Sequence, residues 1–142
     1  MDVTPSRFFP SSKSTYILIV TEYKDKCISG ILTAPLLNKS YVFRDLVQLL
    51  LLMESLMDDA KFPQHCVAPR AFQAGHITFS PRETTEKPAC PLAVFDISVM
   101  FRQNASWQGS ILWRSRMMES RFRSVLELVG LMDDALTAAL EQ

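Results

Sequence analysis

Hydrophobic and polar residues alternate strictly in the second half of the chain. In residues 95–102, Phe95, Ile97, Val99 and Phe101 share one side, and the residues between them are mostly polar. Period-two alternation is typical of a strand with one buried face. Residues 107–113 alternate in the same way, and residues 103–106 between them contain Asn and Ser, which favour turns. The pattern predicts a β-hairpin.

A second hairpin is predicted near the start of the chain. Residues 15–23 are rich in β-branched and aromatic side chains and predict a strand. Lys24-Asp25-Lys26 predicts a turn, and residues 27–34 predict the partner strand.

Each hairpin precedes a stretch of helical periodicity. In residues 41–59 the apolar positions recur every three or four residues, and the same holds in residues 121–139. Ser40 and Ser120 stand directly before these stretches and are suitable helix N-caps. The sequence predicts helices starting at Tyr41 and Arg121.

These elements come into register when the chain is shifted by 79 positions. Gly30 then lies over Gly109, and the dipeptide Phe43-Arg44 lies over Phe122-Arg123. Internal similarity of this kind indicates repeated structural units. We therefore predict an α+β fold made by internal duplication, ββα-ββα. Its four-stranded antiparallel sheet would carry two helices packed on one face.

The domain organisation follows from this pattern. Residues 1–14 are predicted to be a loose N-terminal arm, and residues 15–142 a single domain with repeats at 15–59 and 94–139. The linker, residues 60–93, holds five of the eight prolines, which exclude a long helix. A short extra strand at residues 74–79 is one interpretation of this segment, and an irregular course is the other.

The first helix is apolar around most of its circumference, which predicts burial on several sides or an oligomer contact. We expect a homodimer that self-associates through outer positions of this helix, namely Leu49, Leu52 and Leu56.

Composition limits the class of protein. The 142 residues carry fifteen basic and fifteen acidic side chains, so no global field steers the chain to nucleic acid or anionic lipid. No apolar run approaches the length of a membrane span. Three scattered cysteines form no disulfide framework, which favours the reducing cytoplasm. We expect a cytoplasmic protein that makes no membrane contact.

The tip of the second hairpin is the most distinctive candidate site. In a binding interpretation, the Trp of this tip stacks on a ligand, the Arg pairs with an anion and the side-chain amides form hydrogen bonds. A structural interpretation places Trp107 in the core and assigns Asn104 and Ser106 to the turn. The candidate contact residues are Arg102, Gln103, Asn104, Trp107, Gln108, Trp113 and Arg114.

Other chemistry has weaker support. Arg102, Arg114, Arg116, Arg121 and Arg123 form a local basic patch, so a nucleic-acid-associated regulator is the alternative function. His65, Cys66, His76 and Cys90 in the linker lack the paired spacing of zinc sites, and we expect no metal and no other cofactor. No nucleophile motif or phosphate-binding glycine loop occurs, so we expect no enzymatic activity.

The second half of the chain resembles a family of small uncharacterised proteins of Firmicutes-type bacteria. The resemblance lies in Phe-Arg-Gln-Asn-Ala-Ser-Trp-Gln-Gly at residues 101–109, and in the later Arg-Phe-Arg-Ser-Val-Leu-Glu-Leu and Leu-Met-Asp runs. It implies a bacterial origin and carries no activity or cofactor. Together with the residues, it leaves a protein-interaction or regulatory module as the expected function.

Overall fold

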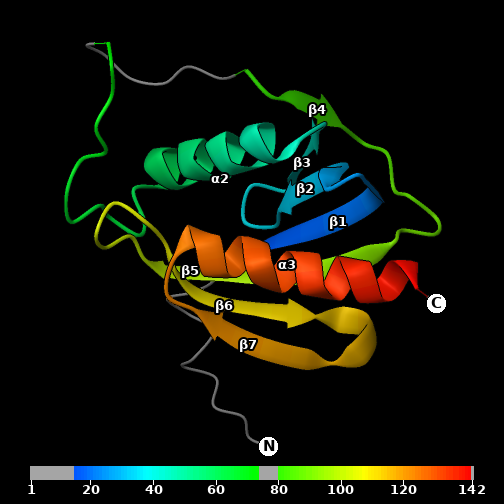
Figure 1. Ribbon diagram of the computed structural model, residues 1–142. Coiled ribbons are helices and arrows are strands. Elements are labelled where there is room, and N and C mark those ends of the chain that lie inside the picture. Colours follow the sequence, from blue (N-terminus) through cyan, green and yellow to red (C-terminus); the bar gives the residue numbers. More distant parts are fainter. Residues whose placement is uncertain (1–14, 74–79, 142) are drawn as a thin grey trace, which may run out of the picture.

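The computed structural model describes residues 15–73 and 80–141 as an α+β fold with a seven-stranded antiparallel sheet. The strand order is β4-β3-β2-β1-β5-β6-β7, and both helices lie on one face of the sheet (Figure 1). The elements are β1 (Thr15–Lys24), β2 (Cys27–Ala34), β3 (Lys39–Phe43), α2 (Leu46–Ala60), β4 (Arg82–Thr84), β5 (Ala93–Phe101), β6 (Gln108–Trp113), the 3-10 turn η3 (Arg114–Arg116), β7 (Met118–Phe122) and α3 (Val125–Leu140).

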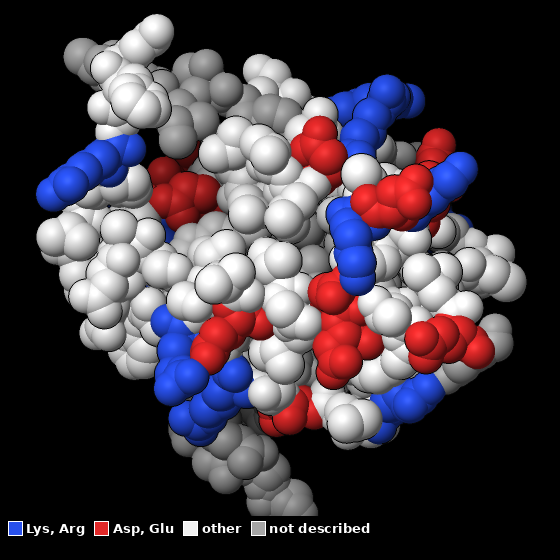
Figure 2. Space-filling model, viewed as in Figure 1, with Lys and Arg blue, Asp and Glu red and all other residues white. Residues whose placement is uncertain are grey.

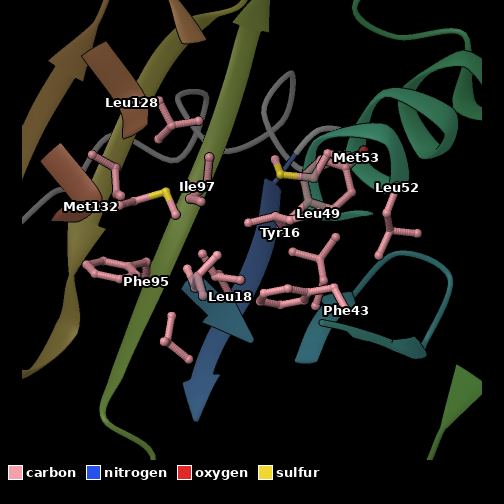
Figure 3. Close-up of a cluster of buried hydrophobic side chains, with 14 of the residues drawn as sticks. Tyr16, Leu18, Phe43, Leu49, Leu52, Met53, Phe95, Ile97, Leu128 and Met132 are labelled. Carbon is pink, nitrogen blue, oxygen red and sulfur yellow. The ribbon is translucent and has the colours of Figure 1, made fainter. Parts of the chain in front are cut away.

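The alternation in the sequence decides which face of the sheet meets the helices. Tyr16, Leu18 and Val20 of β1 are buried, and so are Phe95 and Ile97 of the neighbouring strand β5. These side chains form one core with the inward residues of α2 and α3 (Figure 3). Neither helix in the described residues has the length and the apolar run that crossing a bilayer would take.

The predicted four-stranded sheet is wrong, because each half contributes a third strand and β4 adds a seventh. Residues 39–43 and 118–122 form β3 and β7, and they include the N-caps and the first helical residues that we predicted. Phe43 precedes Leu46 and Val47 by three and four residues, which is a helical spacing. The burial of both Tyr41 and Phe43 fits a strand, because residues two apart do not share one face of a helix. The helices begin five and four residues later than predicted, after the N-caps Asp45 and Ser124, each of which accepts a backbone hydrogen bond from the third residue of its helix.

Positions 79 residues apart nevertheless occupy equivalent places, so the matching units are βββα rather than ββα. The central turn residues of both hairpins have positive φ: Asp25 and Lys26 in one, Asn104 and Ala105 in the other. Register shifts occur at Val20/Glu22 and again at Val99/Phe101. At Gly30 and Gly109 a Cβ would collide with the backbone of the adjacent strand, at Ile19 and Ser98 respectively.

Two described parts of the segment between the halves contact the rest of the chain. β4 pairs with β3 and forms one edge of the sheet. Residues 61–66 run from the end of α2 to the residue that follows β5, where Cys66 donates its backbone N–H to the carbonyl of Arg102. The predicted arm at 1–14, the predicted strand at 74–79 and His76 lie outside the described residues.

The first helix does not present the outer positions that we predicted. Leu49, Leu52 and Leu56 are buried in the core, so the predicted self-association residues are not available for contact with another molecule. The error arose because an almost continuous apolar run does not show which side of a helix faces the sheet. Val47 is the position that points outward, with 65% of its surface exposed.

Candidate functional site

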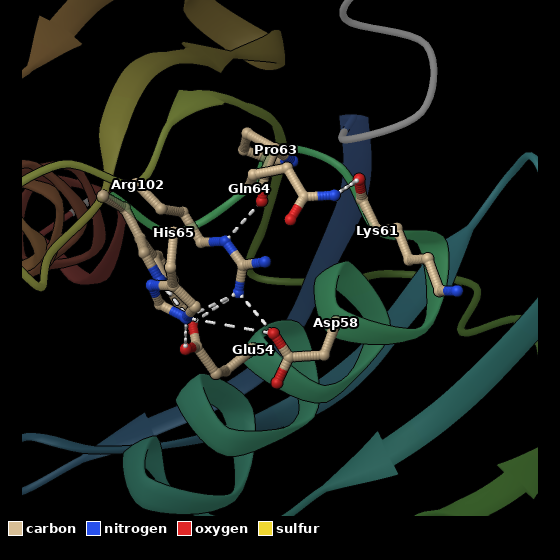
Figure 4. Close-up of polar contacts among 8 residues, drawn as sticks. Glu54, Asp58, Lys61, Pro63, Gln64, His65 and Arg102 are labelled. Atoms are coloured by element: carbon tan, nitrogen blue, oxygen red, sulfur yellow. Dashed lines mark hydrogen bonds and ion pairs between the residues drawn. The ribbon is translucent and has the colours of Figure 1, made fainter. Parts of the chain in front are cut away.

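A buried arginine joins the second hairpin to the helix of the first half. Arg102 follows β5 directly and is 2% exposed. Its Nε donates to the carbonyl of Pro63 at 2.7 Å, and its Nη1 donates to Asp58 Oδ1 at 2.8 Å and lies 3.3 Å from Glu54 Oε1 (Figure 4). A buried guanidinium requires such partners, because an unpaired charge in the interior is strongly unfavourable.

Trp107 and His65 complete this group, which we call the Arg102 cluster (Glu54, Asp58, Pro63, His65, Arg102 and Trp107). The indole of Trp107 is buried and donates to Glu54 Oε1 at 2.8 Å. His65 Nε2 contacts Glu54 Oε2 and lies 3.0 Å from Arg102 Nη1. The two carboxylates are thereby matched by donors that come from the hairpin tip and from residues 61–66.

The Arg102 cluster contains potential metal ligands but already holds a cation of its own. Ligand atoms of Glu54, Asp58 and His65 lie within 4.8 Å of one another. Arg102 Nη1 lies within hydrogen-bond distance of Asp58 and His65, so a metal ion there would face a fixed positive charge. The arrangement fits an internal ion-pair network better than a metal site.

Two of the predicted contact residues point inward, and two others stabilise the turn by hydrogen bonds. Arg102 and Trp107 are buried, so these two side chains do not form an exposed recognition surface. Gln103 and Gln108 hydrogen-bond to each other across the turn, from Gln103 N to Gln108 Oε1 and from Gln108 Nε2 to Gln103 O. Asn104 adopts φ 56°, a conformation that Asn accepts readily.

The remaining two predicted residues lie at the other end of β6. Arg114 forms a bidentate pair with Asp96, which raises the pKa of its guanidinium. The indole nitrogen of Trp113 is buried without a hydrogen-bond partner, and the Arg116 guanidinium lies 4.8 Å from the centre of its ring.

The basic patch is largely neutralised within the chain. Arg102 and Arg114 are ion-paired as described. Arg123 pairs with Glu127 four residues later, and this contact lowers the pKa of the Glu127 carboxyl to about 2. Few of these charges are left to contact a phosphate backbone.

The first hairpin makes the counterpart of the Arg102 contact on the opposite helix. Tyr23, which corresponds to Arg102 at the spacing of 79, donates its hydroxyl to Asp133 Oδ1 of α3 at 2.6 Å. Asp133 corresponds to Glu54 in the same way. Burial and the Asp133 contact raise the pKa of Tyr23 to about 12, and Lys26 followed by Tyr23 lowers that of Asp133.

A groove lies beside this second contact. It has a volume of about 290 Å³ and is bordered by the first hairpin tip, the start of α2 and the middle of α3. We call it the Gly130 groove; its lining residues are Tyr23, Lys26, Ile28, Leu46, Leu126, Val129, Gly130, Met132, Asp133 and Leu136. A Cβ added at Gly130 would meet nothing within 4 Å, so the open space extends over this helical position. Leu126 at its border is 80% exposed.

Two charged side chains, Lys26 and Asp133, are among the residues that line the groove. On the helical face, uncharged surface occupies the centre of the view, and acidic and basic groups lie around it (Figure 2). Lys26 and Asp133 form an ion pair with 2.6 Å between Nζ and Oδ1, at the polar end of the Gly130 groove. A ligand here would meet an apolar surface with one ion pair at its end.

Sequence reasoning missed Tyr23, Asp133, Gly130 and Glu54. The signal that could have found them is the spacing of 79 itself, which aligns Tyr23 with Arg102 and Asp133 with Glu54. A polar residue at a hairpin tip and a carboxylate on a helix recur together in both halves.

Comparison with models of protein families, with curated proteins and with solved structures found no match for this chain.

Proposed function

We propose that this chain is a non-enzymatic protein-interaction module that binds a partner through the Gly130 groove. The observation that carries this proposal is an open apolar groove of about 290 Å³ on the helical face, with Leu126 exposed at its border. Concave apolar sites with a few polar groups at one end are typical of binding sites. We also infer that the halves descend from one duplicated unit.

The polar groups elsewhere support binding better than catalysis. His65, the histidine within the described residues, is engaged with Glu54 and Arg102 and lies away from the Gly130 groove. Lys26 and Asp133 pair with each other. Nucleic-acid binding, the alternative function, has less support than protein binding, because Arg102, Arg114 and Arg123 form ion pairs within the chain.

Selection from a random peptide library, with Gly130→Leu as the counter-target, tests the proposal. Gly130 is exposed in the middle of α3, and a leucine there would fill the groove. We expect peptides that bind the unchanged chain and lose at least tenfold in affinity for Gly130→Leu. Leu37→Ala, on the exposed β2–β3 turn, is the matched control and should keep the affinity. Failure to enrich any peptide, or equal binding to both targets, would contradict the proposal.

Self-association remains part of the proposal, at a different surface from the one predicted. β7 ends the sheet, and four of its five residues are exposed. Antiparallel pairing of two copies about Ser120 would place Glu119 of one opposite Arg121 of the other, which is electrostatically favourable. Light scattering should give the mass of a dimer. Arg121→Glu should give a monomer, and adding Glu119→Arg to it should restore the dimer; a monomeric unchanged chain would contradict this part.

A further inference from the structure

The Gly130 groove is the counterpart of the space between the second hairpin tip and α2, which a tryptophan fills. At the spacing of 79, Ile28 of the first hairpin corresponds to Trp107 of the second, and Gly130 of α3 corresponds to Leu51 of α2. The correspondence holds structurally, because the two hairpin tips share their turn conformation and the register shifts of their strands. Two larger residues at one contact between a hairpin tip and the opposite helix are therefore matched by two smaller ones at the other contact.

The indole of Trp107 shows how such a space is occupied. Its ring is buried against α2, and its Nε1 donates to Glu54 Oε1 at 2.8 Å. At the other contact, Ile28 of the first hairpin is also buried but has no ring or donor, and Gly130 of α3 has no side chain. The space that remains is the Gly130 groove, with Asp133 at the position of Glu54.

The acceptor for an indole is also present. Tyr23, Lys26 and Thr137 all direct their contacts to Oδ1 of Asp133. The second oxygen, Oδ2, can accept a further hydrogen bond, since a carboxylate has about four acceptor positions. An apolar cavity of about 150 Å³ already accommodates benzene, so a groove of about 290 Å³ is large enough for an indole.

We propose that the Gly130 groove receives a tryptophan side chain of a protein partner, whose indole N–H donates to Asp133 as that of Trp107 donates to Glu54. The proposal rests on the proposed function and specifies its ligand. The ring would lie against Leu126, Val129 and Gly130. Lys26 at the rim would favour an acidic residue close to that tryptophan in the partner.

The probe for this proposal is N-acetyltryptophanamide, titrated into the ¹⁵N-labelled full chain and followed by amide chemical shifts. We expect saturable shifts at Val129, Gly130 and Asp133. The 1-methyl-indole derivative of the probe lacks the donor and should bind about tenfold more weakly, because a hydrogen bond to a charged group is lost. N-acetylleucinamide should bind more weakly still.

Two variants introduce the residues found at the Trp107 contact and should abolish these shifts: Gly130→Leu and Ile28→Trp. If Ile28→Trp fails to fold, Gly130→Leu still tests the proposal. Leu37→Ala should bind the probe as the unchanged chain does.

Equal binding of the three probes, or shifts that persist in Gly130→Leu, would overturn the tryptophan assignment. The proposed function fails separately, if no library peptide binds the groove, whether or not it contains tryptophan. Peptides that bind the groove through aliphatic residues would keep the function and refute the assignment.

Discussion

Tyr23 and Arg102 stand 79 positions apart, and each reaches from a hairpin tip to a carboxylate on the helix of the opposite half. Arg102 is closed in by Trp107 and by residues 61–66, and Tyr23 lies beside an open groove. The two contacts bind each half to the other, and beside the Tyr23 contact lies the groove in which we propose that a partner binds.

Arg102→Leu should destabilise the fold strongly, because it leaves Glu54, Asp58 and the Pro63 carbonyl without their shared donor. We expect a loss of about 3 kcal/mol in the free energy of unfolding, measured by urea denaturation. Arg114→Leu removes a pair in which the arginine is 47% exposed, and should cost no more than about 1 kcal/mol. Equal losses in the two variants would show that the Arg102 cluster is not a buried network.

The glycines should respond in opposite directions to alanine. Gly30→Ala and Gly109→Ala each push a methyl group into the backbone of the neighbouring strand and should cost about 3 kcal/mol or more. Gly130→Ala lies in the interior of α3 with free space around it, so it should stabilise the chain by up to about 1 kcal/mol. Thermal unfolding of the three variants measures this, and destabilisation by Gly130→Ala would contradict the open groove.

Alkaline pH should destabilise the chain between about pH 10 and pH 12. Burial raises the pKa of Tyr16 to about 12 against an opposing effect of Arg102, and burial with the Asp133 contact raises that of Tyr23 to about 12. The folded state therefore holds these protons more tightly than the unfolded state, whose tyrosines titrate near 10. The stability present below pH 10 is lost as the pH rises through the folded-state pKa values.

Tyrosinate absorbance at 295 nm, read together with urea denaturation at each pH, measures this loss. Tyr23→Phe should remove one of the two late ionisations and lessen the loss of stability. An unchanged late titration in Tyr23→Phe would argue against the Tyr23–Asp133 contact.

The two tryptophans should differ in what their indole nitrogens contribute. Trp107→Phe removes the donor to Glu54 and should cost about 2 kcal/mol for the lost hydrogen bond, in addition to lost packing. Trp113→Phe removes an indole nitrogen that is buried without a partner and should cost less. Urea denaturation followed by circular dichroism compares the two; a larger cost for Trp113→Phe would contradict the role given to Trp107.

The sequence pattern predicted the strands with clear alternation and the two helices, but not the third strand of each half. In residues 39–43, Phe43 continues the helical spacing of the apolar residues that follow it. Pairing of Tyr41 and Phe43 with Leu32 and Gly30 of β2 places both in a strand instead. β4 is three residues long and carries no periodicity of its own. Short edge strands are defined by a neighbouring strand more than by their own residues.

The candidate site was predictable only in part. The second hairpin tip was predicted as a contact site, but its arginine and tryptophan are buried, and the carboxylates that pair with them lie on a helix distant in the sequence. The open groove arises from small residues, Ile28 and Gly130, and missing volume leaves no motif in a sequence. It becomes visible by comparison with Trp107 and Leu51, which hold the equivalent places.

The most direct test of the account is the set of intermolecular nuclear Overhauser effects between bound N-acetyltryptophanamide and the methyl groups of the chain. The account predicts contacts from the indole ring protons to Leu126 and Val129, with the indole N–H close to Asp133. An indole that gives contacts to methyl groups elsewhere and none to the lining of the Gly130 groove would contradict it.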